Sequence, residues 1–159
     1  MSETIEKVYG KGIWKVEKCK VINGIEQPPY EVIESKNIWL TTGWTEILKI
    51  ITGASANHFD NTNAKIGVGN DATAAAAGQT DLIGASTSYK SMESGFPTTP
   101  ASGTVQFKSK FLTSEANFAW NECVLKNNVS SVCWNRNATG WGTKTSDELW
   151  YMTLTLGAA

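Results

Sequence analysis

The side chains that could do chemistry are few and lie far apart along the chain. His58 is the only histidine among the 159 residues, and no cysteine lies near it in the sequence. A zinc site takes about four ligands, most of them nitrogen or sulfur, and a Ser-His-Asp triad would need this same histidine. The serines also lack the Gly-x-Ser-x-Gly context of a nucleophile elbow. We therefore expect no metal, no cofactor and no catalytic residue.

One glycine-rich phrase formally matches a nucleotide-binding motif. Residues 67–72 read Gly-Val-Gly-Asn-Asp-Ala, which fits the pattern Gly-x-Gly-x-x-Gly/Ala. That pattern works only where a strand leads through the glycines into a helix that packs on a parallel sheet. A polar stretch with an alanine run, Ala74 to Ala77, follows instead. We interpret the phrase as a strand that ends at its glycines.

Four carboxylates in polar stretches could act as acids or bases if two of them converged: Asp60, Asp71, Asp81 and Glu93. Paired carboxylates do such work in glycoside hydrolases. Acidic residues in loops are more often turn formers, because their side chains accept hydrogen bonds from nearby backbone N–H groups. We expect the turn role for these four.

The three cysteines, Cys19, Cys123 and Cys133, show no Cys-x-x-Cys spacing. An odd number without such spacing fits free thiols in a reducing cytosol. Cys123 and Cys133 flank the turn signal Asn127-Asn128, so they would face each other if that turn joins two strands. A buried thiol pair is the favoured interpretation, and a cross-strand disulfide is the alternative.

The charge balance argues against two classes of partner. The chain has 14 basic and 15 acidic residues, a net charge of -1, whereas a nucleic-acid binder usually carries a basic stripe. No run of about 18 apolar residues is present that could span a membrane. The first residues also lack the apolar core of a signal peptide. We expect no nucleic-acid partner and no membrane association.

The clearest helix covers residues 41–53. Its large apolar residues recur at helical spacing and form a single face: Trp44, Ile47, Leu48 and Ile51. Thr42 is placed to cap the N-terminus, and Gly53 suits the position just past the C-terminus. A helix of about three turns is marginal alone, so we expect this face to be buried against the rest of the domain.

Most other patterned segments predict β-strands. Residues 12–22 are rich in β-branched and aromatic side chains, and Asn23-Gly24 is a strong hairpin signal. Pro28 and Pro29 delay the partner strand to residues 30–33, because proline cannot donate a hydrogen bond to the ladder. The prolines therefore argue against a simple two-residue hairpin.

The last third of the chain has the best strand pattern. Apolar residues at every second position predict strands over residues 105–111 and 150–156. Shorter strands are expected over three further segments: residues 64–69, 118–125 and 129–134. Turn-forming residues dominate the connections, so the strands are short and the turns frequent, as in sandwiches and barrels.

These elements predict a mainly β fold, an antiparallel β-sandwich of jelly-roll type with one short packed helix. We expect a single sandwich domain over residues 13–159. Residues 1–12 are polar, and we expect them to form a flexible N-terminal arm that orders on a neighbour.

Seven tryptophans in 159 residues is a high number. Tryptophan buries a large area and is enriched at interfaces, although it also fills cores. Four tryptophans lie near predicted turns or strand ends and are the candidate interface residues: Trp14, Trp39, Trp134 and Trp141. Because aromatic anchors dominate binding energy at interfaces, we expect some of them to contact a partner.

The order of several short phrases resembles a loosely defined group of tailed-phage virion proteins, over about residues 12–157. The first two phrases are Lys36-Asn37-Ile38-Trp39 and a helix that begins with Thr41-Thr42-Gly43-Trp44. The third is the strand Ile66-Gly67-Val68-Gly69, whose following tail ends at Thr80-Asp81-Leu82. The last two are Phe118-Ala119-Trp120-Asn121-Glu122 and the segment from Lys144 to Leu149, which precedes a final strand. Cys123-Val124-Leu125 departs from the Gly-Leu that usually follows Asn-Glu in this group.

The resemblance implies a structural role without catalysis. The resemblance implies a head decoration (cement) or auxiliary capsid protein that binds the major capsid protein in the virion as a homo-oligomer, with a trimer favoured. It also implies assembly in the cytoplasm of a host cell. Linked contacts to several neighbours would add avidity. A tail or baseplate component is the first alternative. A carbohydrate-binding module, with Trp134, Trp141 and Trp150 stacking on sugars, is the second.

Overall fold

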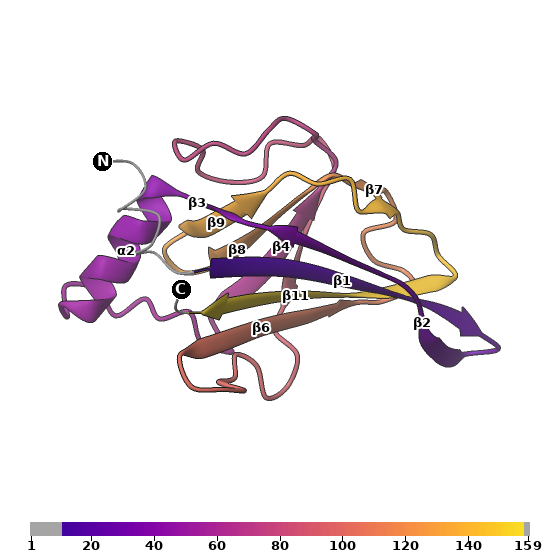
Figure 1. Ribbon diagram of the computed structural model, residues 1–159. Helices are drawn as coiled ribbons and strands as arrows, with labels where there is room; N and C mark the ends of the chain where they lie inside the picture. Colours follow the sequence, from indigo (N-terminus) through magenta and orange to yellow (C-terminus); the bar gives the residue numbers. More distant parts are fainter. Residues whose placement is uncertain (1–10, 158–159) are drawn as a thin grey trace.

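The computed structural model describes residues 11–157, which build two antiparallel sheets and one helix (Figure 1). One sheet has the order β2-β1-β11-β6, with β1 (Lys11–Ile22), β2 (Ile25–Lys36), β6 (Thr104–Phe111) and β11 (Glu148–Gly157). The other has the order β3-β9-β8-β4-β5, with β3 (Ile38–Trp39), β4 (Ala64–Gly69), β5 (Thr87–Ser91), β8 (Glu122–Asn127) and β9 (Cys133–Asn137). A short ribbon pairs β7 (Ala119–Trp120) with β10 (Gly142–Thr143), and α2 spans Thr41–Ile51.

The core lies between the two sheets. In β11 every second side chain points inward, and the register places Leu154 opposite Trp14 of β1 and Phe107 of β6. Ile66 of β4 and Leu125 of β8 meet these side chains from the other sheet. Each large apolar side chain that is removed from water in this way contributes roughly 1.5–3 kcal/mol. The antiparallel β-sandwich with one helix is therefore confirmed, and the jelly-roll connection stays a prediction.

The boundary between the predicted N-terminal arm and the sandwich differs from the one expected. Lys11 and Gly12 were assigned to the N-terminal arm, but they pair with Gly157 and Leu156 as the first residues of β1. The rest of the predicted arm, residues 1–10, lies outside the described residues.

The β1–β2 hairpin corrects the argument from Pro28 and Pro29. Ile22 pairs directly with Ile25 across a two-residue turn, in which Asn23 and Gly24 have positive φ angles of 52° and 77°. The prolines lie within β2, which is possible because β2 is the edge strand of its sheet. Opposite these prolines, the pairing of β1 with β2 shifts register between Lys18 and Val21 of β1. The shifts accommodate the backbone hydrogen bonds that the prolines cannot donate.

The helix forms where expected, but its orientation differs. Gly43 and Glu46 are its buried residues, whereas Leu48 and Ile51 of the predicted buried face are 49% and 73% exposed. A Cβ at Gly43 would lie 2.3 Å from the Cα of Trp134, so the absent side chain lets α2 approach β9 closely. The Glu46 carboxylate accepts hydrogen bonds from Ser55 and Asn57. These contacts turn the apolar stripe outward.

The caps of the helix also differ in part from the prediction. Leu40 occupies the N-cap position, and no side-chain hydrogen bond caps the helix, so the proposed cap by Thr42 is wrong. At the other end Gly53 has a φ of 73°, as expected for a residue just past the C-terminus.

Candidate functional site

The groups that could have formed a catalytic or metal site lie apart. Within residues 11–157 no three side chains of His, Cys, Asp or Glu are placed to hold a metal ion. Asp60 accepts hydrogen bonds from the backbone N–H groups of Thr62 and Asn63, and Asp71 accepts one from Thr73. These two carboxylates are turn formers, as predicted. The 67–72 phrase ends β4 within an antiparallel sheet, so the strand interpretation is confirmed.

Asp81 differs from Asp60 and Asp71, because it joins a polar cluster. No turn hydrogen bond of the Glu93 carboxylate is found among the described residues, so its turn role stays a prediction. Asp81 accepts hydrogen bonds from Tyr89 (2.6 Å), from Lys126 and from the thiol of Cys133 (3.3 Å). Burial alone would raise the pKa of Asp81, but the hydrogen bonds from Lys126 and Tyr89 hold it below its usual value. Burial, followed by the nearby Asp81 charge, raises the pKa of Cys133. A thiol with a raised pKa is a poor nucleophile, so Cys133 is not activated at this position.

The cysteines of β8 and β9 do not face each other. Cys123 pairs with Asn137, and Cys133 pairs with Lys126. Cys19, Cys123 and Cys133 are all free and buried. The predicted free thiols are confirmed for this structure, and the idea of a facing Cys123–Cys133 pair is wrong because the register separates the two residues.

A buried ion pair that the sequence did not reveal joins β8 to β9. Glu122 and Arg136 are both fully buried, and the Arg136 guanidinium donates two hydrogen bonds to one Glu122 carboxylate oxygen, at 2.8 and 3.0 Å. The other oxygen accepts from the backbone N–H of Gly84 at 2.7 Å. Arg136 also donates to the carbonyl of Thr73 and to the side chain of Gln79. The pair therefore fixes the loop between β4 and β5.

Two of the four candidate interface tryptophans belong to the core. Trp14 and Trp141 are fully buried. Strand alternation turns Trp14 inward, and a backbone hydrogen bond from Trp141 to the carbonyl of Trp120 holds its loop against the sandwich. Neither is available to a partner in this structure, which corrects the prediction for both. Trp134 is half-buried, with its ring 5.5 Å from that of Phe59 and 5.6 Å from that of Trp39.

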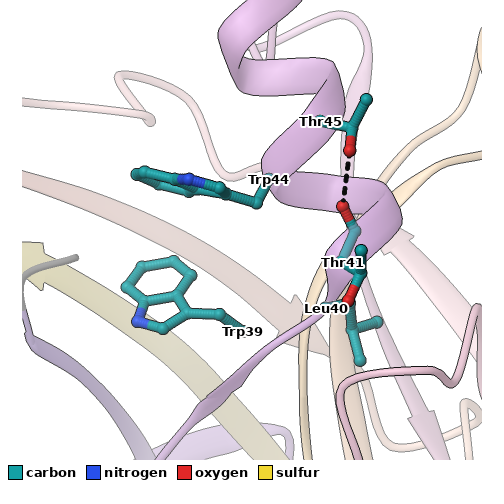
Figure 2. Close-up of a pocket in the computed structure, with 5 residues that line it drawn as sticks. All are labelled: Trp39, Leu40, Thr41, Trp44 and Thr45. Atoms are coloured by element: carbon teal, nitrogen blue, oxygen red, sulfur yellow. Dashed lines mark hydrogen bonds between the residues drawn. The ribbon is translucent and has the colours of Figure 1, made fainter. Parts of the chain in front are cut away.

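Trp39 is the candidate that reaches a surface pocket. Figure 2 shows this pocket, of about 250 Å³, which is lined by Trp39, Leu40, Thr41, Trp44 and Thr45. The rings of Trp39 and Trp44 lie 5.9 Å apart at an angle of 54°. Leu48 and Ile51 continue the stripe along the helix. We call Trp39, Trp44, Leu48 and Ile51 the α2 surface.

A second apolar surface lies on the β1–β2 hairpin, at the opposite end of the molecule from α2 (Figure 1). It consists of four exposed side chains: Ile22, Ile25, Tyr30 and Val32. We call these four residues the hairpin arm. Three of them belong to β2, whose outer edge has no neighbouring strand in the sheet among the described residues.

Polar contacts hold the base of the hairpin arm. The hydroxyl of Tyr30 donates to the Glu148 carboxylate at 2.6 Å, and Lys20 lies 2.8 Å from the same carboxylate. Although burial alone would raise the pKa of Glu148, these contacts hold it below its usual value. The arm is thus anchored to β11, while its apolar side chains remain open to solvent.

Comparisons with family models, curated proteins and solved structures find no match. No helix in residues 11–157 has the length and apolar character needed to cross a membrane. Function is therefore inferred from the surfaces and contacts of the chain itself.

Proposed function

We propose that this protein is a structural component of a tailed-bacteriophage virion that works by binding other virion proteins and catalyses no reaction. The observation that carries the proposal is the hairpin arm, an anchored edge strand with Ile22, Ile25, Tyr30 and Val32 exposed. Exposed apolar side chains on an open edge favour association with another protein. The order of phrases shared with tailed-phage virion proteins supports the same role.

Within this role we propose a head decoration protein that binds the capsid lattice as a homo-oligomer, with a trimer favoured. A small domain gains lattice affinity when several linked copies bind at once. Pro28 and Pro29 cannot donate hydrogen bonds from the middle of β2. The contact is therefore expected to rest on side-chain burial around the hairpin tip more than on continuous strand pairing.

A tail or baseplate role would use the same hairpin arm and stays the alternative. The experiment below distinguishes it from the head decoration role. The carbohydrate-binding role is no longer supported by the tryptophans that suggested it. Trp141 and Trp150 are buried and cannot stack on a sugar, and Trp134 packs among Trp39, Phe59 and Phe107.

Binding to preformed capsids tests the proposal. Undecorated capsids incubated with the purified protein should show saturable binding, and sedimentation of the protein alone should show an oligomer. The variant Ile25→Ser should weaken capsid binding. Val129→Ser is the matched control, because Ile25 and Val129 are both 65% exposed but Val129 lies on the β8–β9 turn.

Equal capsid binding by the Ile25→Ser and Val129→Ser variants would refute the role of the hairpin arm. Binding to purified tails, with none to capsids, would refute the head assignment and establish the tail alternative. Binding to neither particle would refute the virion proposal itself.

A further inference from the structure

The tip of the β1–β2 hairpin carries a residue pair with a chemistry of its own. Asn23-Gly24 is the one Asn-Gly pair in the sequence. Both residues are exposed, and the hairpin tip lies at the end of the molecule opposite α2 (Figure 1). A Cβ added at Gly24 would meet nothing within 4 Å. The backbone around Gly24 is therefore free of neighbours that would hinder a reaction there.

The carboxamide of Asn23 makes no hydrogen bond within residues 11–157. Most other asparagine side chains of the described chain are held in place. For example, the carboxamides of Asn61, Asn127 and Asn137 each donate to an oxygen of another segment. A carboxamide without a partner can rotate toward the peptide nitrogen that follows it, so Asn23 is both accessible and free to turn.

Asn23 and Gly24 together can close a succinimide ring. The peptide nitrogen of Gly24 attacks the Cγ atom of Asn23 and loses its proton, and the carboxamide nitrogen leaves as ammonia. Water then opens the ring at Cγ to give aspartate, or at the main-chain carbonyl to give isoaspartate. Water is consumed and ammonia is released, so the reaction needs no oxidant or reductant. Glycine favours the attack because it has no Cβ to crowd the nitrogen.

We propose that Asn23 converts spontaneously to aspartate and isoaspartate in the folded protein, which makes the hairpin tip a site of self-modification. Asn23 and Gly24 have φ angles of 52° and 77°, and Ile22 pairs with Ile25 across them. Aspartate tolerates a positive φ as asparagine does, so this product keeps the turn and adds a negative charge. Isoaspartate lengthens the backbone path, so it disturbs the pairing of Ile22 with Ile25, because turn geometry sets hairpin register.

Asn128 provides a matched comparison inside the same molecule. It is exposed, lies in the turn that joins β8 to β9, and its carboxamide also makes no hydrogen bond within the described residues. The difference lies in the next residue, because the β-branched side chain of Val129 crowds the peptide nitrogen that would attack. Asn23 is therefore expected to react faster than Asn128.

Peptide mapping by mass spectrometry, after incubation of the folded full-length protein, tests the proposal. Asn23 should convert several-fold faster than Asn128, at a rate that rises with pH because the attacking nitrogen must lose its proton. An isoaspartyl methyltransferase should label the hairpin peptide. Val129→Gly should bring the rate at Asn128 close to that at Asn23. Gly43→Ala strains the contact of α2 with β9, at the opposite end, and should leave the rate at Asn23 unchanged.

Two outcomes would overturn the proposal. Equal conversion of Asn23 and Asn128 in the folded protein would show that the turn protects Asn23. Faster conversion of Asn23 in the Gly43→Ala variant than in the wild type would show that the reaction takes place in unfolded chains.

The effect of the modification on binding rests on the proposed function. Because Asn23→Asp places a charge between Ile22 and Ile25, it should bind undecorated capsids more weakly than the wild type, whereas Asn128→Asp should bind equally well. Equal binding by both variants would refute the effect on the hairpin arm. If the wild type binds no capsids, the proposed function fails, and the mass measurement still decides whether Asn23 is modified.

Discussion

At the scale of single residues, the Glu122–Arg136 pair lies at the centre of a buried set of polar contacts. Both side chains are fully buried, and together they contact β8, β9 and the loop that carries Gln79 and Gly84. Burying two charges is costly unless their hydrogen bonds are satisfied. Here the two Glu122 carboxylate oxygens and the three Arg136 guanidinium nitrogens all have hydrogen-bond partners. Neither buried charge is therefore left uncompensated.

Removing one partner of this pair should be strongly destabilising. Arg136→Met leaves the Glu122 carboxylate buried and unpaired, and we expect the free energy of unfolding to fall by about 3–5 kcal/mol. The double variant Glu122→Gln/Arg136→Met removes the orphaned charge and should recover part of the loss. Urea unfolding of both variants measures this. Equal stability of Arg136→Met and the wild type would show that the pair is not buried as described.

Lys144 is a second buried cation, with a pH-dependent consequence. Its ammonium donates to the carbonyl of Leu112 (2.7 Å) and to Asn117 (2.9 Å), and burial lowers its pKa to about 8. In the unfolded chain the pKa returns to the ordinary lysine value of 10.5. Between these values the unfolded chain holds a proton that the folded protein has released, so the Lys144 contribution to stability increases as pH rises.

This pH effect should be visible against the variant Lys144→Met. From pH 8 to 10.5 the wild type should gain stability relative to the variant by up to about 1.4 kcal/mol per pH unit. Other groups that titrate in this range are present in both proteins and cancel in the difference. Urea unfolding across this pH range gives the two curves. Parallel curves would contradict the lowered pKa.

At the scale of elements, the position of α2 depends on the absence of one side chain. Gly43 lies against the backbone of Cys133 and Trp134, where a Cβ would come within 2.3–2.7 Å of three backbone atoms. In a solvent-exposed helix, replacement of glycine by alanine is stabilising by roughly 1 kcal/mol. Here the contact with β9 reverses that expectation.

Gly43→Ala should therefore lower the free energy of unfolding by about 1–3 kcal/mol, as overpacking does elsewhere. Thr42→Ala is the adjacent control, because Thr42 is exposed and makes no cap hydrogen bond. Thermal or urea unfolding of both variants measures the difference. A stabilised Gly43→Ala variant would mean that α2 does not pack closely on β9.

The hairpin arm depends in a similar way on its turn. Gly24 has a φ of 77° and nothing within 4 Å of an added Cβ, so its requirement for glycine is purely conformational. Gly24→Ala should destabilise by about 1–2 kcal/mol, because an L-residue is disfavoured in the left-handed region. Gly78 is the matched control, since it is equally open but lacks a positive φ. Equal unfolding free energies for Gly24→Ala and Gly78→Ala would contradict the observed turn.

At the scale of the whole molecule, the sandwich shields all of its thiols. Cys19, Cys123 and Cys133 are buried and free, and burial raises the pKa of each. Because the thiolate is the reactive form, a thiol reagent should modify the native protein very slowly. After denaturation without reductant, titration should count all three cysteines. A count of one would show a disulfide that this structure excludes.

Short-range patterns were sufficient for the elements whose neighbours agree with them. The alternation of Trp150, Met152 and Leu154 identifies an inward strand face, and β11 has that face. The Asn23-Gly24 pair predicts a tight turn because both residues tolerate positive φ. Only the argument from Pro28 and Pro29 failed there, since it did not anticipate that β2 would be an edge strand.

The direction in which the helix faces was decided by tertiary structure. Periodicity shows that Trp44, Leu48 and Ile51 share a stripe, but it does not show what the stripe contacts. The fit of Gly43 against β9 and the hydrogen bonds of Glu46 turned that stripe outward. These contacts join positions that are distant in the chain, which no local pattern records.

The same limit applies to the candidate interface and to the polar interior. Trp14 and Trp141 resembled Trp39 as residues near predicted strand ends, yet only packing between the sheets decided that the first two are buried. Glu122 and Arg136 lie on adjacent strands and meet only because of the β8–β9 register. Sequence determined β11, the Asn23-Gly24 turn and the extent of the helix through backbone preference and periodicity. It did not determine the bounds of β2 and β9, which were predicted over residues 30–33 and 129–134 but span Ile25–Lys36 and Cys133–Asn137. Tertiary structure decided which side chains remain exposed, because burial depends on contacts between segments far apart in the chain.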